Sequence, residues 1–329
     1  MTDALSDQFN ERTNIMRLLT YRTGSEHRVG LLDGSGVIDL WTVAAKVQQG
    51  LPTTGAIEVL LEIPNWQQLI VQVRERSSGI QLELSSLDIG PVVYRPRNVF
   101  VVAANTISHL KEASAVTNGA APLKPVVLAK SPGALSGPSD PIIHPNLSAK
   151  VDYEAEIGVI IGTTCRNVPE AEVNQVIAGY TVTNDVSARD YQLSEWEPNS
   201  FYRTHYLGKS FDGFCPCGPV MVTPDEVPNL ESRSVRCWVN GELRQDEPVS
   251  GLYFSIPKVV SFISSVMTLY PGDMLLMGTP AGVGSFSDPT RYLAPGDVVR
   301  CEVEGIGFIE NLIVGDEAAV RIDRRSALA

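Results

Sequence analysis

Two glutamates and one aspartate near the middle of the chain could together hold a metal ion. Glu154 and Glu156 are two positions apart, so on a β-strand both carboxylates point to the same face. The run that follows, residues 157–161, is nearly all apolar and predicts a buried strand. Neighbouring buried anions are costly unless a cation neutralises them, and Mg²⁺, Mn²⁺ and Ca²⁺ prefer oxygen ligands. Asp185 ends another strand-like run and could supply a third carboxylate.

The spacing of the two glutamates also allows a second interpretation. Alternating glutamates commonly lie on the solvent face of an edge strand, where they bind no metal. From spacing alone, that arrangement is the commoner one. The polar cluster at residues 183–190 favours the metal site, because it is too dense for a simple turn.

The elements that must position these acids are mostly strands. Short apolar runs separated by glycine-rich turns predict a β-rich region beyond residue 95, with helices only at 169–178 and 257–269. Before that point, residues 16–40 predict short strands, and residues 41–78 show the three- and four-residue periodicity of helices. We therefore expect an α+β protein with a small N-terminal α+β domain (1–95) and a larger catalytic domain (96–329).

Composition narrows the class of protein. The chain has 329 residues, of which 43% are hydrophobic and 19% charged, as in ordinary soluble globular proteins. A net charge of −12 argues against a nucleic-acid partner, although a bound metal can still attract an anionic substrate. The chain shows neither a signal peptide nor an apolar run of about 18 residues, so we expect a cytoplasmic protein without a membrane partner.

Other catalytic and binding motifs are weak or missing. Five cysteines without repeated CxxC spacing favour reduced structural thiols, and Cys215 and Cys217 are interpreted in that way rather than as a redox or zinc pair. The glycine patterns match neither a dinucleotide-binding loop nor a phosphate-binding loop. The G-x-S-x-G turn of many serine hydrolases is also missing.

Four segments occur in the order and approximate spacing of the fumarylacetoacetate hydrolase family: DYEAEIGVIIG, AGYTVTNDVSARDYQ, GKSFDGFCPCGP and MGTPAGVG. The chain resembles this family from about residue 97 to residue 314. The resemblance implies a mixed β-roll with stacked sheets, and commonly a homodimer. It also implies that Glu154, Glu156 and Asp185 are metal ligands, most simply for Mg²⁺ or Mn²⁺, with Ca²⁺ as an alternative ion.

The same resemblance assigns roles around the substrate. Lys209 matches an active-site lysine that could stabilise developing negative charge or hold a carboxylate. Arg189, Gln192 and Thr279 match positions near the substrate. For two of these residues a purely structural role is also open. Arg189 could pair with Asp190 or another acid, and Thr279 could serve merely to shape a rigid turn.

A segment that resembles the family's mobile lid contains Asn105, His109 and Glu112. On a short helix, His109 and Glu112 share a face, so the carboxylate could orient the imidazole as a general base that activates water. A bare H-x-x-E on a surface helix is more often only solvated. The chain has Thr106 where the family usually has tyrosine, which puts the packing of the lid in question.

The long stretch 194–207 between two active-site motifs is expected to shape the substrate pocket, with Arg203 as a carboxylate clamp. His27, His144 and His205 have no comparable support as catalytic residues.

The expected activity is metal-dependent hydrolysis of a carbon–carbon bond in a small 1,3-diketo acid, such as an acylpyruvate or a fumarylacetoacetate-like compound, through a metal-bound enolate. His109 with Glu112 favours this reaction because the pair can activate water. The alternative is a decarboxylase, or an enol–keto isomerase or hydratase, of a 2-oxo diacid in aromatic catabolism. A third possibility, a scaffold subunit without turnover, conflicts with the presence of both the ligand trio and the lid pair.

Overall fold

The computed structural model describes residues 16–77, 81–114, 118–199, 203 and 205–316. Its strands form a 12-stranded sheet, a five-stranded sheet and a separate strand pair, with few helices. The five-stranded sheet packs against the middle of the large one, so the main core lies between stacked sheets. This α+β architecture confirms the fold class expected from the sequence.

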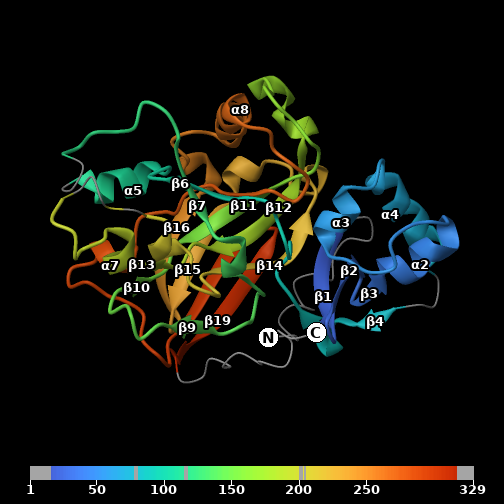
Figure 1. Cartoon of the computed structure of the whole chain (residues 1–329), viewed down its shortest axis with the longest axis horizontal. Helices are drawn as coiled ribbons and strands as arrows, with labels where there is room; N and C mark the ends of the chain where they lie inside the picture. The colour runs from blue at the N-terminus through green and yellow to red at the C-terminus, as the bar shows by residue number, and fades with distance from the viewer. Residues whose placement is uncertain (1–15, 78–80, 115–117, 200–202, 204, 317–329) are drawn as a thin grey trace.

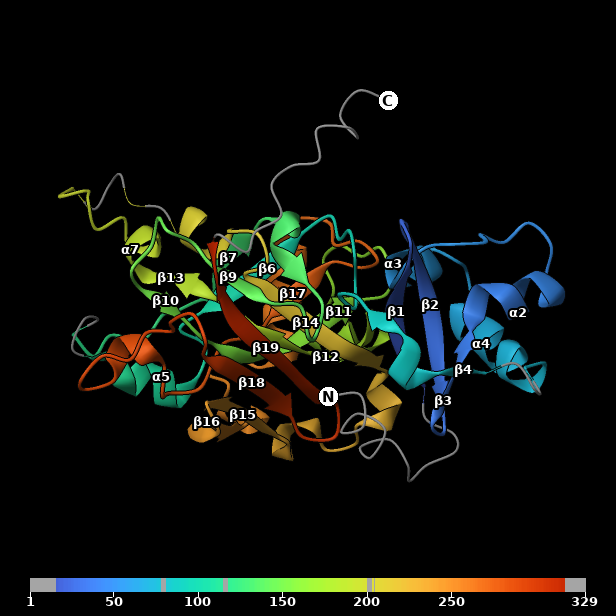
Figure 2. The same cartoon turned by 90° about the horizontal axis from the view of Figure 1, so that it is seen from below.

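The N-terminal elements form one end of the molecule, opposite α5 (Ile107–Glu112) and α7 (Arg189–Gln192) (Figures 1 and 2). Glycines with positive φ, such as Gly24 and Gly34, make the tight turns that connect the first strands. Asp39 begins the first helix by accepting the Thr42 N–H at 3.0 Å. The strands expected within 16–40 and the helical segments expected within 41–78 are both present. They are β1 (Arg17–Thr23), β2 (Glu26–Asp33), β3 (Gly36–Asp39), α2 (Leu40–Val47), α3 (Ile57–Leu61) and α4 (Trp66–Glu75), followed by β4 (Leu82–Glu83) and β5 (Asp88–Ile89).

The remaining chain is mainly strands, as expected. They are β6 (Val99–Ala103), β7 (Val126–Lys130), β8 (Leu135–Ser136), β9 (Ile142–His144), β10 (Val151–Asp152), β11 (Ala155–Ile161), β12 (Ile177–Asn184), β13 (Ser187–Ala188), β14 (Cys215–Val222), β15 (Ser234–Val239), β16 (Glu242–Pro248), β17 (Met274–Leu276), β18 (Val298–Val303) and β19 (Gly307–Gly315). The one long helix here is α8 (Ile256–Val266), which confirms the helix expected at 257–269 but ends earlier.

The prediction of an α-helix at 169–178 is wrong. The structure has a short 3₁₀ segment, Glu170–Gln175, and then enters β12 at Ile177. Only Val173 of the 3₁₀ segment is buried, whereas all of β12 is buried. The apolar residues at the end of the expected helix are therefore more stable as part of the sheet, where they bury their side chains.

The large sheet runs through both parts of the chain, in the order β4-β3-β2-β1-β14-β12-β11-β17-β6-β7. Strand β1 pairs with β14, with Leu18 opposite Met221. A second apolar core contains Leu60 and Ile70 from the N-terminal helices together with Ile160 and Met221 from the central strands. The proposed boundary near residue 95 remains a prediction, and hydrogen bonds of one continuous sheet cross it. Among the described residues, no helix has the length and apolar character needed to cross a membrane.

Because this second core joins both parts of the chain, Leu60→Ala should destabilise the whole protein. Leu60 is fully buried, and a buried leucine truncated to alanine costs about 2–5 kcal/mol. The measurement is urea unfolding of the metal-free protein, with Val71→Ala as control because Val71 on α4 is 45% exposed. A change below about 0.5 kcal/mol for both variants would contradict a shared core.

Candidate active site

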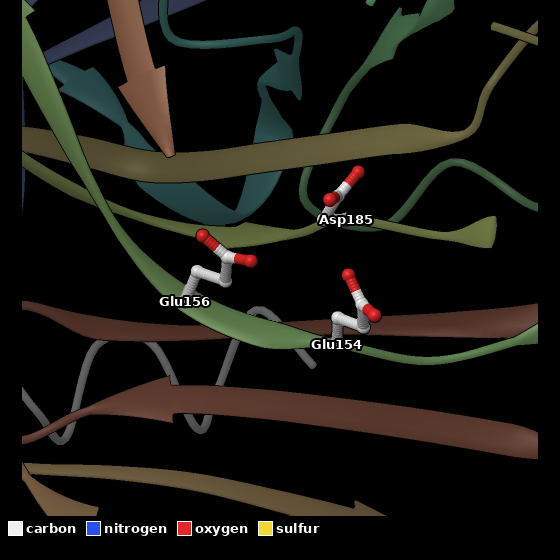
Figure 3. A group of neighbouring side chains, drawn as sticks. All are labelled: Glu154, Glu156 and Asp185. Carbon is white, nitrogen blue, oxygen red and sulfur yellow. The ribbon is translucent and has the colours of Figure 1, made fainter. Parts of the chain in front are cut away.

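Three carboxylates meet where two neighbouring strands of the large sheet come together. Glu154 precedes β11, Glu156 lies on it, and Asp185 follows β12; the register places Ala155 opposite Asn184. One oxygen from each of the three side chains lies within 4.8 Å of the others. Figure 3 shows Glu154 and Glu156 on the same side of their strand, with Asp185 across from them.

These acids do not lie on a solvent-exposed edge. Strand β11 is paired on both sides, with β12 and β17. Glu154, Glu156 and Asp185 expose 5%, 1% and 0% of their surface. The solvent-face interpretation of the two glutamates is therefore wrong.

Buried cations compensate two of the three carboxylates. Glu154 accepts Arg189 at 2.7 Å and Lys209 Nζ at 2.9 Å. Burial alone would raise the pKa of Glu154, but the charges of Arg189 and Lys209 hold it well below its ordinary value. Asp185 lies between two ammonium groups, with Oδ1 bound by Lys130 and Oδ2 by Lys209.

Glu156 is the carboxylate without such compensation. Among the described residues, its carboxylate takes part in none of the ion pairs and accepts the backbone N–H of Gly278. Burial, and then the negative charges of Asp185 and Glu154, raise the pKa of Glu156 well above its ordinary value. A buried, uncompensated carboxylate beside two others is what a divalent cation would neutralise, so the residues fit a hard metal ion.

A cavity of about 410 Å³ adjoins this cluster. Most of the residues predicted for the active site line it: His109, Glu154, Glu156, Arg189, Gln192, Arg203, Lys209 and Thr279. One wall is apolar and comes from β6, the end of α5 and the loop before β18, including Val101, Ala113 and Phe286. Asp185, Asn105 and Glu112 are not among the lining residues.

The predicted pairing of His109 and Glu112 is present on α5. The Thr106 side chain begins this helix by accepting the His109 N–H at 3.2 Å. Nδ1 of His109 lies 2.9 Å from Oε2 of Glu112, whose Oε1 accepts the Gly282 N–H at 2.8 Å. Both oxygens of this carboxylate thus have a partner, and among the described residues no hydrogen bond is made by the other imidazole nitrogen, Nε2, of His109, which lines the cavity.

Thr106, where the family usually has tyrosine, has a clear packing role. Its hydroxyl donates to the backbone oxygen of Thr279 at 2.6 Å, which ties the start of α5 to the loop that follows β17. Asn105 acts in the same place: its Nδ2 donates to Met277 O at 2.7 Å, and its Oδ1 accepts the Phe254 N–H at 2.9 Å. Asn105 therefore joins backbone segments instead of facing the cavity, which does not support the substrate contact expected for it.

Arg189 combines both of the roles considered for it. It lines the cavity, and it pairs with Glu154 and with Asp152, whose Oδ2 lies 2.8 Å from its Nε. Among the described residues, Asp190 is not one of its ion-pair partners. The Asp190 carboxylate accepts the hydroxyl of Ser148 at 2.7 Å instead. Arg189 also donates to Oε1 of Gln192 at 2.9 Å, which orients that amide.

Thr279 and Arg203 differ in the exposure and the hydrogen bonding of their side chains. The Thr279 hydroxyl donates to Ala155 O and accepts from Gln245, so it is already used inside the protein. Arg203 is exposed and donates from Nε and Nη2 to Glu197 O at 3.2 and 3.1 Å. Several other residues of the 194–207 stretch lie outside the described part of the chain.

Sequence reasoning missed two buried charged residues that contact the site, Asp152 and Lys130. Asp152 begins the same motif as Glu154, so its position could have drawn attention. Lys130 ends the short strand-like run VVLAK, which carries no chemical signal, and only the folded chain places it beside Asp185. The five cysteines are buried and unpaired, including Cys215 and Cys217 on β14.

Known proteins similar to this chain indicate its family. The family described as fumarylacetoacetate (FAA) hydrolase C-terminal matches residues 98–314, which is well over half of the chain. The chain belongs to the fumarylacetoacetate hydrolase family. This assignment confirms the resemblance seen in the four sequence motifs.

Curated relatives of this family member cover nearly its whole length. A protein of Rattus norvegicus named "Oxaloacetate tautomerase Fahd2a, mitochondrial" is 35% identical, over 91% of this chain and 92% of the relative. A protein of Xenopus laevis named "Oxaloacetate tautomerase fahd2, mitochondrial" is 37% identical, over 91% and 90%. Because these names say mitochondrial, the cytoplasmic location expected from the sequence remains a prediction.

Solved structures show the same fold. Fumarylacetoacetate hydrolase from Exiguobacterium antarcticum is 31% identical over 91% of this chain and 99% of the other, with a TM-score of 0.74. Maleylpyruvate hydrolase from Sphingobium sp. SYK-6, solved with manganese(II) and pyruvate, is 26% identical over 91% and 99%, with a TM-score of 0.72. A related enzyme of the same fold therefore binds a divalent metal, while the ion and the homodimer expected for this chain remain predictions.

Glu156→Gln tests whether the uncompensated carboxylate exists to bind metal. Because the pKa of Glu156 is raised in the folded state, ionising it as the pH rises costs stability, so the metal-free variant should be more stable than wild type at neutral pH. The amide oxygen can still accept the Gly278 N–H. In contrast, saturating Mn²⁺ should stabilise wild type, by about 2.7 kcal/mol at 100 times Kd, and the variant much less.

The measurement is thermal unfolding with and without Mn²⁺, and the control is Glu242→Gln, which alters an exposed ion-pairing glutamate. Equal Mn²⁺ stabilisation of wild type and Glu156→Gln would remove Glu156 from the metal site.

Proposed function

We propose that this protein is a divalent-metal-dependent keto–enol tautomerase of a small 2-oxo diacid, with oxaloacetate as the representative substrate. The observation that carries the proposal is one cavity that joins an oriented base, His109, to the carboxylate cluster and to the cations Arg189 and Lys209. The two curated relatives named oxaloacetate tautomerase support this choice, because they match over about nine tenths of both chains.

Glu154, Glu156 and Asp185 would hold the metal, Mg²⁺ or Mn²⁺. Bound there, the ion would supply Lewis-acid stabilisation of negative charge on the substrate oxygens.

His109 is the group that would move the proton. In ketonisation, the enol oxygen loses a proton and the neighbouring carbon gains one, so the atoms balance without water or any other reactant. A neutral imidazole whose Nδ1 is held by Glu112 can take the first proton on Nε2, and the Glu112 carboxylate stabilises the imidazolium that results. The surroundings of His109 in the cavity are partly apolar, and the centre of the Phe286 ring lies 5.6 Å from that of the imidazole.

Cations would orient the substrate. Lys209 lines the cavity and lies against Glu154 and Asp185, where its ammonium group can also stabilise negative charge on a substrate oxygen. Arg203 lines the cavity as well, and the guanidinium contacts described for it are with a backbone oxygen. It is therefore suited to hold the distal carboxylate of a diacid.

Hydrolysis of a carbon–carbon bond, the activity placed first by the sequence alone, is the second candidate. A base oriented by a carboxylate can also activate a water that adds to a carbonyl, after which the carbon–carbon bond breaks and the leaving carbon takes up a proton. The names of the solved relatives, fumarylacetoacetate hydrolase and maleylpyruvate hydrolase, favour this candidate. Their identity to this chain, 31% and 26%, is lower than that of the tautomerases.

His109→Ala should lower kcat for conversion of enol-oxaloacetate to the keto form by about 10²- to 10⁴-fold, because it removes the base. The reaction is followed by the loss of enol ultraviolet absorbance with Mn²⁺ present. His144→Ala is the matched control, since His144 on β9 is not among the residues that line the cavity. A wild-type enzyme that does not exceed the metal-only rate would refute the tautomerase.

The two candidates separate in water labelled with oxygen-18. A tautomerase incorporates no label during a single turnover of the enol into any carboxylate, whereas a hydrolase supplied with an acylpyruvate or maleylpyruvate introduces the label into a product acid. Label in the product, together with no acceleration of enol-oxaloacetate conversion, would establish hydrolysis. Release of CO₂ would identify decarboxylation.

Arg203→Ala should raise KM for the diacid by about tenfold, since one charge-assisted contact to an exposed cation is lost, with little change in kcat. The KM for enols of 2-oxo monoacids such as pyruvate, which lack the distal carboxylate, should not change. Arg291→Ala is the control because Arg291 is exposed and pairs with Glu242. An equal rise in KM for both classes of substrate would contradict the clamp.

A further inference from the structure

Lys130 is a buried cation next to the cavity but not part of its lining. It ends β7, and its side chain has no solvent-exposed surface. Its Nζ donates to Asp185 Oδ1 and to Val186 O, the latter at 3.0 Å. A buried ammonium group is costly, and only well-placed acceptors offset that cost. Its location therefore depends on Asp185, one of the three carboxylates of the site.

The contacts of Asp185 are divided between two lysines with different surroundings. Lys209 binds Oδ2 and lines the cavity, whereas Lys130 binds Oδ1 and is not among the residues that line the cavity. The other two carboxylates are also bound by donors of the protein: Arg189 binds Glu154 Oε1, Lys209 binds Glu154 Oε2, and the Gly278 N–H binds Glu156 Oε2. Lys130 supplies the corresponding donor for Asp185.

The backbone around Lys130 is itself held in place. Lys130 lies opposite Val99 on the paired strand β6. The next residue, Ser131, donates its N–H to Ser210 Oγ at 2.9 Å. Ser210 directly follows the 3₁₀ turn Leu207–Lys209. The end of β7 therefore fixes both the ammonium group on Asp185 Oδ1 and the turn that carries Lys209.

We propose that Lys130 is a positioning residue of the metal site. It holds Asp185 so that Oδ2 stays turned toward Glu154 and Glu156, and it has no contact with the substrate. This inference rests on the metal dependence in the proposed function. A positioning partner behind a metal ligand typically changes metal affinity by about 10- to 100-fold when it is removed.

The test is a Mn²⁺ titration of the full chain, followed by the electron paramagnetic resonance signal of free Mn²⁺, for wild type and Lys130→Met. We expect Kd for Mn²⁺ to rise about 10- to 100-fold, because Asp185 loses the donor that orients it. At saturating Mn²⁺, kcat of this variant should return to within about threefold of wild type. Lys209→Met should instead lose kcat at any Mn²⁺ concentration, since Lys209 lines the cavity.

Lys258→Met is the matched control, because Lys258 forms an exposed ion pair with Glu170 at 2.9 Å. If Lys130→Met does not fold, Lys130→Gln carries the same test, because its shorter, neutral side chain removes the ammonium group from Asp185 Oδ1, and a Kd raised at least tenfold is expected for it.

An unchanged Kd would overturn the inference, and so would a loss of kcat that excess Mn²⁺ does not restore. Wild type that binds no Mn²⁺ would refute the metal dependence of the proposed function itself, which distinguishes the two failures.

Discussion

The burial of several like charges in one small volume is the constraint on which the rest of this structure depends. Four carboxylates, those of Asp152, Glu154, Glu156 and Asp185, lie in the interior with three cations, Lys130, Arg189 and Lys209. One negative charge is left over, and Glu156 is the group without an ion-pair partner among these residues. An arrangement of this kind costs stability unless a further cation binds, so it is better explained by metal binding than by folding.

The sheet provides the rigid frame that this charge cluster requires. Strands β11 and β12 carry the acids on adjacent, fully buried backbones, and β17 continues into the loop that binds both Glu156 and Glu112. Gly278 and Gly282 of that loop have positive φ, and a Cβ at Gly282 would clash with Arg244 O. Glu156 and the His109–Glu112 pair are therefore tied to one loop, so their separation is set by the fold.

Much of the site could be predicted from the sequence because its residues lie in short, dense motifs. Glu154 and Glu156 show the strand period, and His109 and Glu112 show the helix period, so each pair is recognisable locally. The order and spacing of the family motifs then indicate that the two pairs belong to one site. The expected helix at 169–178 failed for the opposite reason: its local preference was overridden by pairing of β12 with distant strands.

The sequence by itself determined the α+β class, the family and the three candidate carboxylates Glu154, Glu156 and Asp185, since these depend on residue type and short spacing. Only the tertiary structure decided that Glu156 lacks an ion-pair partner among the buried cations, that Asn105 joins backbone segments, and that Lys130 holds Asp185 across 55 residues of chain. These facts depend on which distant segments meet, because the energy of a buried charge is set by its neighbours in space and not by those in sequence.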